Sequence, residues 1–209
     1  MLARSPIAPE GPLARHDGWE IGTRHSTAPL TLIDLTPLAK VLVHAPTGGA
    51  MAEALGVSFG RAVRTTAAAV EPALIVGSGP GEWLVLAGVG TQARVRRRLE
   101  VTAAETGEFV SVVDLTHGRA LVRLRGAASL DLLAKVCAVD LDDRVMPNGA
   151  AFRSSVAGLV TDVVRDDIGP VRSYLLHCER STGQYLADSL LDAGAEFGIG
   201  VDRFTPPGI

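Results

Sequence analysis

Aromatic residues, cysteines and long apolar runs are all scarce in this chain. Aromatics make up 4% of the 209 residues, and the two cysteines, Cys137 and Cys178, lie far apart in the sequence. Two distant cysteines do not form a disulfide framework, so we expect a protein of the reducing cytoplasm. No apolar run approaches the roughly 20 residues that cross a bilayer, and the first residues lack the apolar core of a signal peptide. We therefore expect no membrane span and no secretion.

Charge of one sign is not in large excess either. The chain has 20 Lys and Arg against 23 Asp and Glu, a net charge of -3, and a hydrophobic share of 47%. These values are typical of a globular protein and exclude a disordered acidic chain. The densest basic cluster is Arg94, Arg96, Arg97 and Arg98. It has no interleaved aromatics, which disfavours nucleic-acid binding and favours a solvated helix face or a patch for an acidic protein surface.

The motifs of common active sites are also missing. Residues 77–81 read Gly-Ser-Gly-Pro-Gly, but a strand pattern follows them where a phosphate loop needs a helix, so they predict a hairpin turn. No Gly-x-Ser-x-Gly occurs, and the paired acids Asp142-Asp143 and Asp166-Asp167 sit by turn residues and are interpreted as solvated loops. The histidines are scattered without metal-ligand spacing: His16, His25, His44, His117 and His177. We expect no catalytic, cofactor-binding or metal site on this chain.

The stretch that organises the chain is residues 110–141. A β-branched run ends at the corner Asp114-Leu115-Thr116, a second strand alternates apolar and polar residues from 120 to 125, and a helix follows Gly126. An earlier copy of the corner, Asp34-Leu35-Thr36, is also followed by a strand and a short helix. The earlier copy has Pro37 where the later one has His117, so the corner is interpreted as structural, with Asp and Thr side chains bonding to the turn backbone. A catalytic role for His117 is disfavoured for the same reason.

A second internal similarity extends the repeat. The strand that begins at Trp83 and the strand that begins at Tyr174 are each followed by a polar turn and a helix. Each half then has the order β-α-β-β-α, close to a split βαβ unit. We therefore predict an α+β fold of two pseudo-repeated, ferredoxin-like halves, 31–107 and 108–200, joined edge to edge or packed face to face. They form a single domain, 31–209, preceded by an extended arm, 1–30. We expect a single strand over about 152–164, and a capping box at Ser181 and Gln184.

A series of motifs carries a resemblance to a known family. In chain order the motifs are Gly79-Pro80-Gly81-Glu82-Trp83-Leu84-Val85-Leu86, Val113-Asp114-Leu115-Thr116-His117-Gly118-Arg119, Leu124-Arg125-Gly126 and Leu133-Ala134-Lys135-Val136-Cys137-Ala138-Val139-Asp140-Leu141. Together with Arg4-Ser5-Pro6 and Phe152-Arg153-Ser154-Ser155, they resemble the gamma subunit of heterotetrameric sarcosine oxidase over most of the chain. The chain departs from that family's pattern at Val136 and Ala138, where Gly and Pro are common. More loosely, the motifs resemble the folate-binding fold of the glycine-cleavage aminomethyltransferase, which has duplicated α+β halves.

The resemblance implies a function in an assembly. Such an assembly converts sarcosine, O2 and tetrahydrofolate into glycine, hydrogen peroxide and 5,10-methylenetetrahydrofolate. The resemblance places FAD, FMN, NAD, tetrahydrofolate and zinc on the alpha, beta and delta subunits, and makes the gamma subunit a non-catalytic part docked on alpha. The alternative is a small folate- or one-carbon-binding protein that acts alone.

The predicted contact with the partner lies in the arm. Arg4, Ser5, Pro6 and Trp19 stand in a segment with no core pattern, yet it holds one of only two tryptophans. Aromatic and Arg residues are common anchors of interfaces, so these four residues are the predicted partner interface. Trp83, which leads a predicted core strand, is expected to be buried inside the fold.

Overall fold

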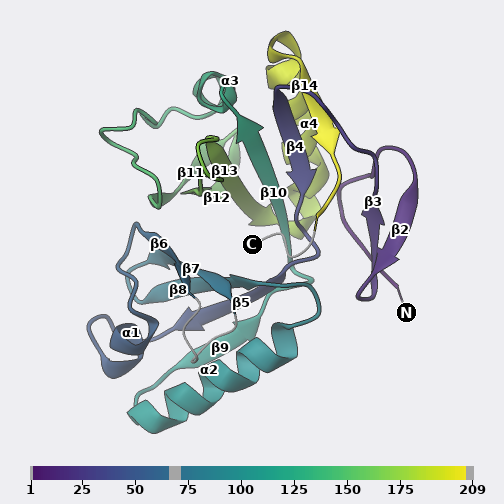
Figure 1. Cartoon of the computed structure of the whole chain (residues 1–209). Helices are drawn as coiled ribbons and strands as arrows, with labels where there is room; N and C mark the ends of the chain where they lie inside the picture. Colours follow the sequence, from purple (N-terminus) through teal and green to yellow (C-terminus); the bar gives the residue numbers. More distant parts are fainter. Residues whose placement is uncertain (1, 66–71, 206–209) are drawn as a thin grey trace. The chain divides into compact units, whose positions relative to one another are not determined.

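The computed structural model describes residues 2–65 and 72–205. The chain divides into two compact units, each built around its own sheet. The larger unit comprises residues 2–37 and 118–205, and the smaller unit comprises residues 38–117. Both units combine β-sheets with helices, so the chain is α+β (Figure 1).

The smaller unit is a five-stranded sheet with two helices. The strand order is β6 (Ala62–Thr65), β7 (Ala73–Gly79), β8 (Glu82–Ala87), β5 (Ala39–His44) and β9 (Ser111–Asp114), and the helices are α1 (Ala50–Leu55) and α2 (Gln92–Thr106). All neighbouring strands are antiparallel. Because β5 is antiparallel to both β8 and β9, these two strands run parallel, with β5 between them and α2 connecting them.

The core of the smaller unit lies under its helices. Val41, Val85 and Trp83 from the sheet pack with Met51 of α1 and Leu99 of α2. Trp83 is 5% exposed, and its Nε1 donates to the carbonyl of Val57 at 2.7 Å. The prediction that Trp83 is buried inside the fold is confirmed. The predicted hairpin turn is formed by Pro80 and Gly81, while residues 77–79 belong to the end of β7, where the pairing with β8 has a bulge between Gly77 and Gly79.

The larger unit is a six-stranded sheet with a second, small sheet. The six strands are β11 (Ala151–Val156), β12 (Leu159–Arg165), β13 (Ser173–Glu179), β10 (Arg119–Gly126), β4 (Leu30–Asp34) and β14 (Ile199–Asp202). The small sheet consists of β1 (Ala3–Arg4), β3 (Trp19–Gly22) and β2 (Leu13–His16). The helices are α3 (Ser129–Val136), α4 (Gly183–Gly194) and the 3-10 turns η1 (Arg180–Thr182) and η2 (Ala195–Phe197).

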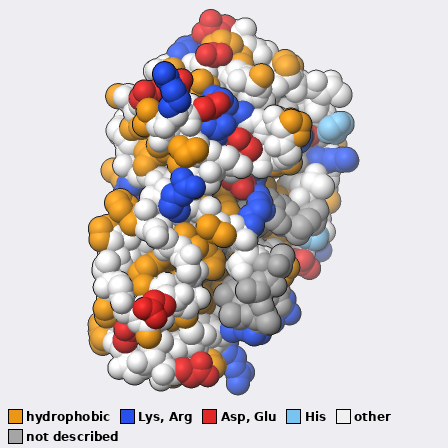
Figure 2. All heavy atoms as spheres, turned by 60° about the vertical axis from the view of Figure 1, so that its left-hand side comes forward, with side chains coloured by type: hydrophobic (Ala, Val, Ile, Leu, Met, Phe, Trp, Pro, Cys, Tyr) orange, Lys and Arg blue, Asp and Glu red, His pale blue; other side chains and the backbone are white. Residues whose placement is uncertain are grey.

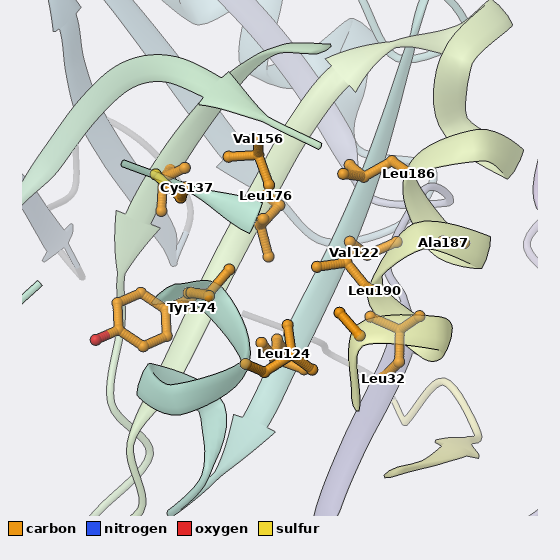
Figure 3. Close-up of a cluster of buried hydrophobic side chains, with 14 of the residues drawn as sticks. Leu32, Val122, Leu124, Cys137, Val156, Tyr174, Leu176, Leu186, Ala187 and Leu190 are labelled. Carbon is orange, nitrogen blue, oxygen red and sulfur yellow. The ribbon is translucent and has the colours of Figure 1, made fainter. Parts of the chain in front are cut away.

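The core of the larger unit lies between its six-stranded sheet and its helices. Leu186, Ala187 and Leu190 of α4 point at the apolar side chains of β4, β10 and β13 (Figure 3). Val122 and Leu124 of β10 are at most 1% exposed. Alternation along β10 therefore places Arg123 on the opposite face of the sheet.

Three predictions from the sequence need correction. The strand predicted over 152–164 is a hairpin, because the chain turns at Ala157 (φ 50°) and Gly158 (φ 81°). Its two-residue turn lacks the Asn-Gly or Asp-Gly signal that marks such turns in a sequence. The capping box does not form: no side chain caps α4, and the side-chain oxygen of Gln184 accepts from the N–H of Ala8 at 2.6 Å instead. Of the paired acids, Asp166 and Asp167 are largely buried and are not solvated, whereas the side chains of Asp142 and Asp143 are 44% and 61% exposed, as predicted.

The grouping of the strands also differs from the predicted halves 31–107 and 108–200. Strand β4 pairs with β10 of the larger unit, and β9 pairs with β5 of the smaller unit. Each predicted half therefore contributes its first strand to the sheet of the other half. Periodicity along the sequence identifies both strands, but it does not say which edge each strand joins.

Candidate functional site

The two Asp-Leu-Thr corners have the same local geometry. The N–H of Thr36 donates to Asp34 Oδ1 at 2.9 Å, and the N–H of Thr116 donates to Asp114 Oδ1 at 2.9 Å. Each is an Asx turn, in which a short acidic side chain takes the place of a backbone acceptor. The prediction that the corners are structural is confirmed.

Each threonine hydroxyl also accepts a backbone hydrogen bond from a strand of the same sheet. Thr36 Oγ1 accepts from the N–H of Leu121 at 3.2 Å, and Thr116 Oγ1 accepts from the N–H of Lys40 at 3.1 Å. Both threonines are fully buried. Lys40 is also fully buried, and its Nζ donates to the carbonyls of Leu38 and Thr116. His117, which follows Thr116 in the chain, is exposed at the surface. The second corner therefore organises the backbone of its sheet.

The most concentrated charge in the larger unit surrounds Arg123. The Arg123 side chain is 2% exposed, and its Nη2 lies 2.7 Å from Asp166 Oδ2. Its Nη1 donates to Ser173 Oγ at 2.8 Å and to the carbonyl of Asp166 at 3.1 Å. The guanidinium thus ties strand β10 to the turn between β12 and β13.

A second arginine extends this network to the other acidic pair. Arg165 Nη2 lies 3.0 Å from Asp167 Oδ2, and its Nη1 lies 2.6 Å from Asp143 Oδ1. Asp143 also pairs with Arg172. Burial by itself would lower the pKa of the Arg165 guanidinium. The hydrogen bonds to Asp167 and Asp143 outweigh burial and raise this pKa above its ordinary value. Of the predicted solvated acids, Asp166 and Asp167 are thus largely buried and ion-paired.

The third buried charge group is on the same sheet. Asp162 lies 3.3 Å from His177 Nδ1 and accepts from Arg153 Nε at 2.6 Å. Burial alone would raise the pKa of Asp162, but the hydrogen bonds of His177 and Arg153 outweigh it and lower that pKa below its ordinary value. The buried carboxylates of the described residues, Asp162 and Asp166, are therefore both held by basic side chains.

These networks connect strands and turns of the larger unit. No group of three or more His, Cys, Asp or Glu in the described residues is arranged to hold a metal ion. Free Cys137 and Cys178 are buried in the core of the larger unit, and burial raises the pKa of the Cys178 thiol. A thiol with a raised pKa is a poor nucleophile at neutral pH.

A ligand-sized hollow is present in the smaller unit. It has a volume of about 380 Å³ and is lined by residues of α1, the loop after it and the β7–β8 turn, among them Glu53, Phe59 and Trp83. Phe59 is 61% exposed, so the hollow is open to solvent. The hollow does not offer a buried acid that could bind a pterin. Glu53, the carboxylate among the residues that line it, is exposed.

The predicted interface residues of the arm contact the larger unit of the same chain. Trp19 is 3% exposed, which leaves little of its ring for a partner. Pro6 packs against Gly183, where an added Cβ would lie 2.9 Å from Pro6 Cγ, and Ser5 Oγ accepts from the N–H of Ile7. The carbonyl of Arg4 accepts from Arg180 Nη2, while the Arg4 side chain is exposed. Most of the arm is therefore not extended but forms the three-stranded sheet β1-β3-β2, a feature that its Pro- and Gly-rich sequence does not reveal.

Surface charge is mixed on the face that Figure 2 shows. Acidic and basic side chains are interspersed there with scattered hydrophobic ones, so this face presents no large field of one sign. No helix of the described residues is long and apolar enough to cross a membrane.

Comparisons with known proteins identify the family. The family described as "GCVT N-terminal domain" matches residues 23–201. The gamma subunit of sarcosine oxidase from Corynebacterium sp. (strain P-1) is 30% identical over 148 residues, which are 71% of this chain and 70% of that protein.

Two solved structures share the fold. A chain of the heterotetrameric sarcosine oxidase from Corynebacterium sp. U-96 superposes with a TM-score of 0.70 at 23% identity, covering 84% of this chain and 89% of that one. Aminomethyltransferase T of the glycine cleavage system from Bartonella henselae superposes with a TM-score of 0.74 at 14% identity, covering 97% of this chain and 60% of that one. The fold is therefore aminomethyltransferase-like, and the predicted resemblance is confirmed. The chain belongs to the GCVT N-terminal domain family and is a homologue of sarcosine oxidase gamma subunits.

Proposed function

We propose that this chain is the non-catalytic gamma subunit of a heterotetrameric sarcosine oxidase and stabilises the assembly by contact with the alpha subunit. The observation that carries the proposal is the homology to a sarcosine oxidase gamma subunit over about 70% of both chains. The networks around Arg123, Arg165 and Asp162 support it, because the charges in them are held by opposite charges within the larger unit.

The chemistry of the assembly is then supplied by its other subunits. In the proposed reaction, sarcosine, O2 and tetrahydrofolate give glycine, hydrogen peroxide and 5,10-methylenetetrahydrofolate. FAD, FMN, NAD, tetrahydrofolate and zinc belong to the alpha, beta and delta subunits. The proposed compartment is the cytoplasm, where the free thiols of Cys137 and Cys178 stay reduced.

Two further predictions are kept as part of this proposal. Duplication of one β-α-β-β-α segment is supported by the common strand order of the two large sheets. In each sheet, three consecutive strands of an antiparallel meander are followed by the second strand of the same half, β5 or β10, and then by the first strand of the other half, β9 or β4. A contribution of the arm to the interface is supported by the exposed side chain of Arg4. Arg4→Glu is expected to lower co-purification with the alpha subunit, and unchanged recovery counts against the arm.

Co-expression with the alpha, beta and delta subunits of the same organism tests the main proposal. We expect this chain to elute with the yellow flavoprotein subunits, and we expect recovery of the complex to fall when it is omitted. The isolated chain should be colourless. A bound flavin on the isolated chain, or no association with the other subunits, refutes the proposal.

The alternative function, a folate- or one-carbon-binding protein acting alone, makes a different prediction. The hollow beside Glu53, Phe59 and Trp83 is its most suitable location in the described residues. Titration of the isolated chain with tetrahydrofolate should then quench Trp83 fluorescence in a saturable way, and Glu53→Gln should weaken the binding. An absence of quenching favours the subunit function.

A further inference from the structure

Another ligand-sized hollow lies in the larger unit, across strands β10, β4 and β14. It has a volume of about 380 Å³, and Arg125, Thr31 and Asp202 are among the residues that line it. Arg125 pairs in register with Thr31, and Thr31 pairs with Gly200, two residues before Asp202. Because side chains alternate along a strand, all three lining residues are on the face of the sheet opposite its core. The segment that begins at Ser26 walls the hollow, and it comes so close to β14 that an added Cβ at Gly200 would overlap Ser26 Oγ.

Arg125 differs from the other arginines of the six-stranded sheet in having no acidic partner. Its strands carry four more, and each pairs with a carboxylate: Arg119 with Glu179, Arg123 with Asp166, Arg153 with Asp162, and Arg165 with Asp143 and Asp167. Arg125 is half-buried, yet its side chain forms no ion pair or hydrogen bond with the described residues. A guanidinium that has lost part of its hydration is stabilised by an anionic group, and a carboxylate fits it through two parallel hydrogen bonds.

Asp202 brings the opposite charge to the same hollow. Its Oδ1 accepts from the N–H groups of Ser26 and Arg203, both at 2.9 Å, and lies 3.0 Å from His25 Nδ1. The other oxygen, Oδ2, has no partner among the described residues. Burial by itself would raise the pKa of Asp202, but the hydrogen bonds from Ser26, His25 and Arg203 outweigh it and lower that pKa. The carboxylate is therefore charged at neutral pH, and one of its oxygens is available to a cationic group.

Two opposite charges thus line one hollow without forming an ion pair with each other. A simple anion would meet the carboxylate of Asp202, and a simple cation would meet the guanidinium of Arg125, so neither satisfies both groups. A small molecule that carries both charges does. We propose that this hollow binds a small zwitterionic amino acid, with its carboxylate on Arg125 and its ammonium group on Asp202 Oδ2. The volume of about 380 Å³ is in the range of small-molecule sites. Such a site goes beyond the proposed subunit function and does not depend on it.

The test is a titration of the purified full-length chain with glycine, followed by nuclear magnetic resonance of the backbone amides. Acetate and methylammonium are the matched probes, because each carries only one of the two charges. Arg125→Met and Asp202→Asn each remove one proposed contact. Arg203→Met is the control, since this exposed arginine follows Asp202 in the chain but does not line the hollow. Thermal unfolding of each variant verifies that it is folded, and Arg125→Met should keep the wild-type midpoint because Arg125 has no partner to lose among the described residues.

We expect glycine to shift the amide signals of Ser26 and Asp202 in a saturable way. Acetate and methylammonium should bind at least about tenfold more weakly, because each makes only one of the two charge-assisted contacts. Arg125→Met and Asp202→Asn should weaken glycine binding by a similar factor, and Arg203→Met should bind glycine like wild type.

Three results would overturn the proposed site. The first is the absence of a saturable shift with glycine. The second is acetate binding as tight as glycine binding, which would leave an anion site only. The third is unchanged glycine binding by Arg125→Met. None of them bears on entry of the chain into the sarcosine oxidase complex, so failure of the site and failure of the proposed function are distinguishable.

Discussion

Removal of the Arg123 side chain is the most discriminating stability experiment on this fold. Arg123→Met keeps an apolar chain of similar length but leaves the Asp166 carboxylate without its guanidinium. Both side chains are nearly inaccessible, 2% and 7% exposed, and the ion pair is 2.7 Å long. Breaking a buried pair by removing one partner typically costs about 3–5 kcal/mol, because the remaining charge stays buried without compensation. We expect a loss in this range.

Strand β10 offers a matched control. Arg119 pairs with Glu179 of the same neighbouring strand β13 at 2.6 Å, but these side chains are 27% and 61% exposed. Exposed pairs contribute about 0–1 kcal/mol, so Arg119→Met should lower the unfolding free energy by less than about 1 kcal/mol. The two substitutions are the same in chemistry and lie on the same strand. They differ in burial, which is the quantity under test.

Urea unfolding followed by circular dichroism and tryptophan fluorescence measures both variants. Trp19 is buried in the larger unit and Trp83 in the smaller one, so Trp83→Phe leaves a reporter in the unit that contains Arg123. With a slope of about 2–3 kcal/mol per M urea, the expected loss lowers the midpoint for Arg123→Met by about 1–2.5 M. Equal midpoints for Arg123→Met and Arg119→Met would refute the reasoning.

A double-mutant cycle separates the pair from general packing effects. Asp166→Asn in the Arg123→Met background removes the buried charge, so it should restore part of the lost stability. The same change in the wild-type background should destabilise, because it leaves Arg123 charged and buried. A coupling energy near zero would show that the two side chains act independently.

Two further predictions concern a helix terminus and an acid-sensitive pair. The Glu108 carboxylate accepts hydrogen bonds from the first two N–H groups of α1 at 2.8 and 3.0 Å. Glu108→Ala should therefore lower the free energy of unfolding by about 1 kcal/mol, which is measured as a lower thermal midpoint. Glu105→Ala is the exposed control, and it should change the midpoint little. The pKa of Asp162 is lowered in the folded state, so its interactions stabilise the fold above the unfolded-state pKa of about 3.9 and are lost as the pH falls through the lower folded-state pKa. Asp162→Asn should therefore make the unfolding free energy fall less steeply below pH 5 than in wild type, and parallel pH profiles would contradict this.

The sequence predicted well those features that depend on neighbouring residues. The corners at Thr36 and Thr116 form because an Asp side chain two residues earlier reaches the threonine N–H, a contact that local spacing alone specifies. Helix α2, predicted to follow the strand that begins at Trp83, ends at Gly107, which takes the left-handed conformation that glycine favours. The family followed from motifs that lie on these same local elements.

The hairpin at Ala157 and Gly158 and the burial of Trp19 could not be predicted in this way. Ala-Gly is a weak turn signal, and the two-residue turn is fixed by the pairing of β11 with β12. Trp19 belongs to a segment without periodicity, and its burial depends on where the arm folds on the larger unit.

The sequence by itself determined where the main strands and helices of both units lie, how the two corners close, and to which family the chain belongs. Only the tertiary structure decided that β4 and β9 exchange sheets, that residues 152–164 form a hairpin, and that Arg123 meets Asp166 away from solvent. The physical reason is that hydrogen bonding along a strand is the same for any neighbour. Which neighbour a strand pairs with, and which charge loses its water, depends on residues far apart in the chain that come together only on folding.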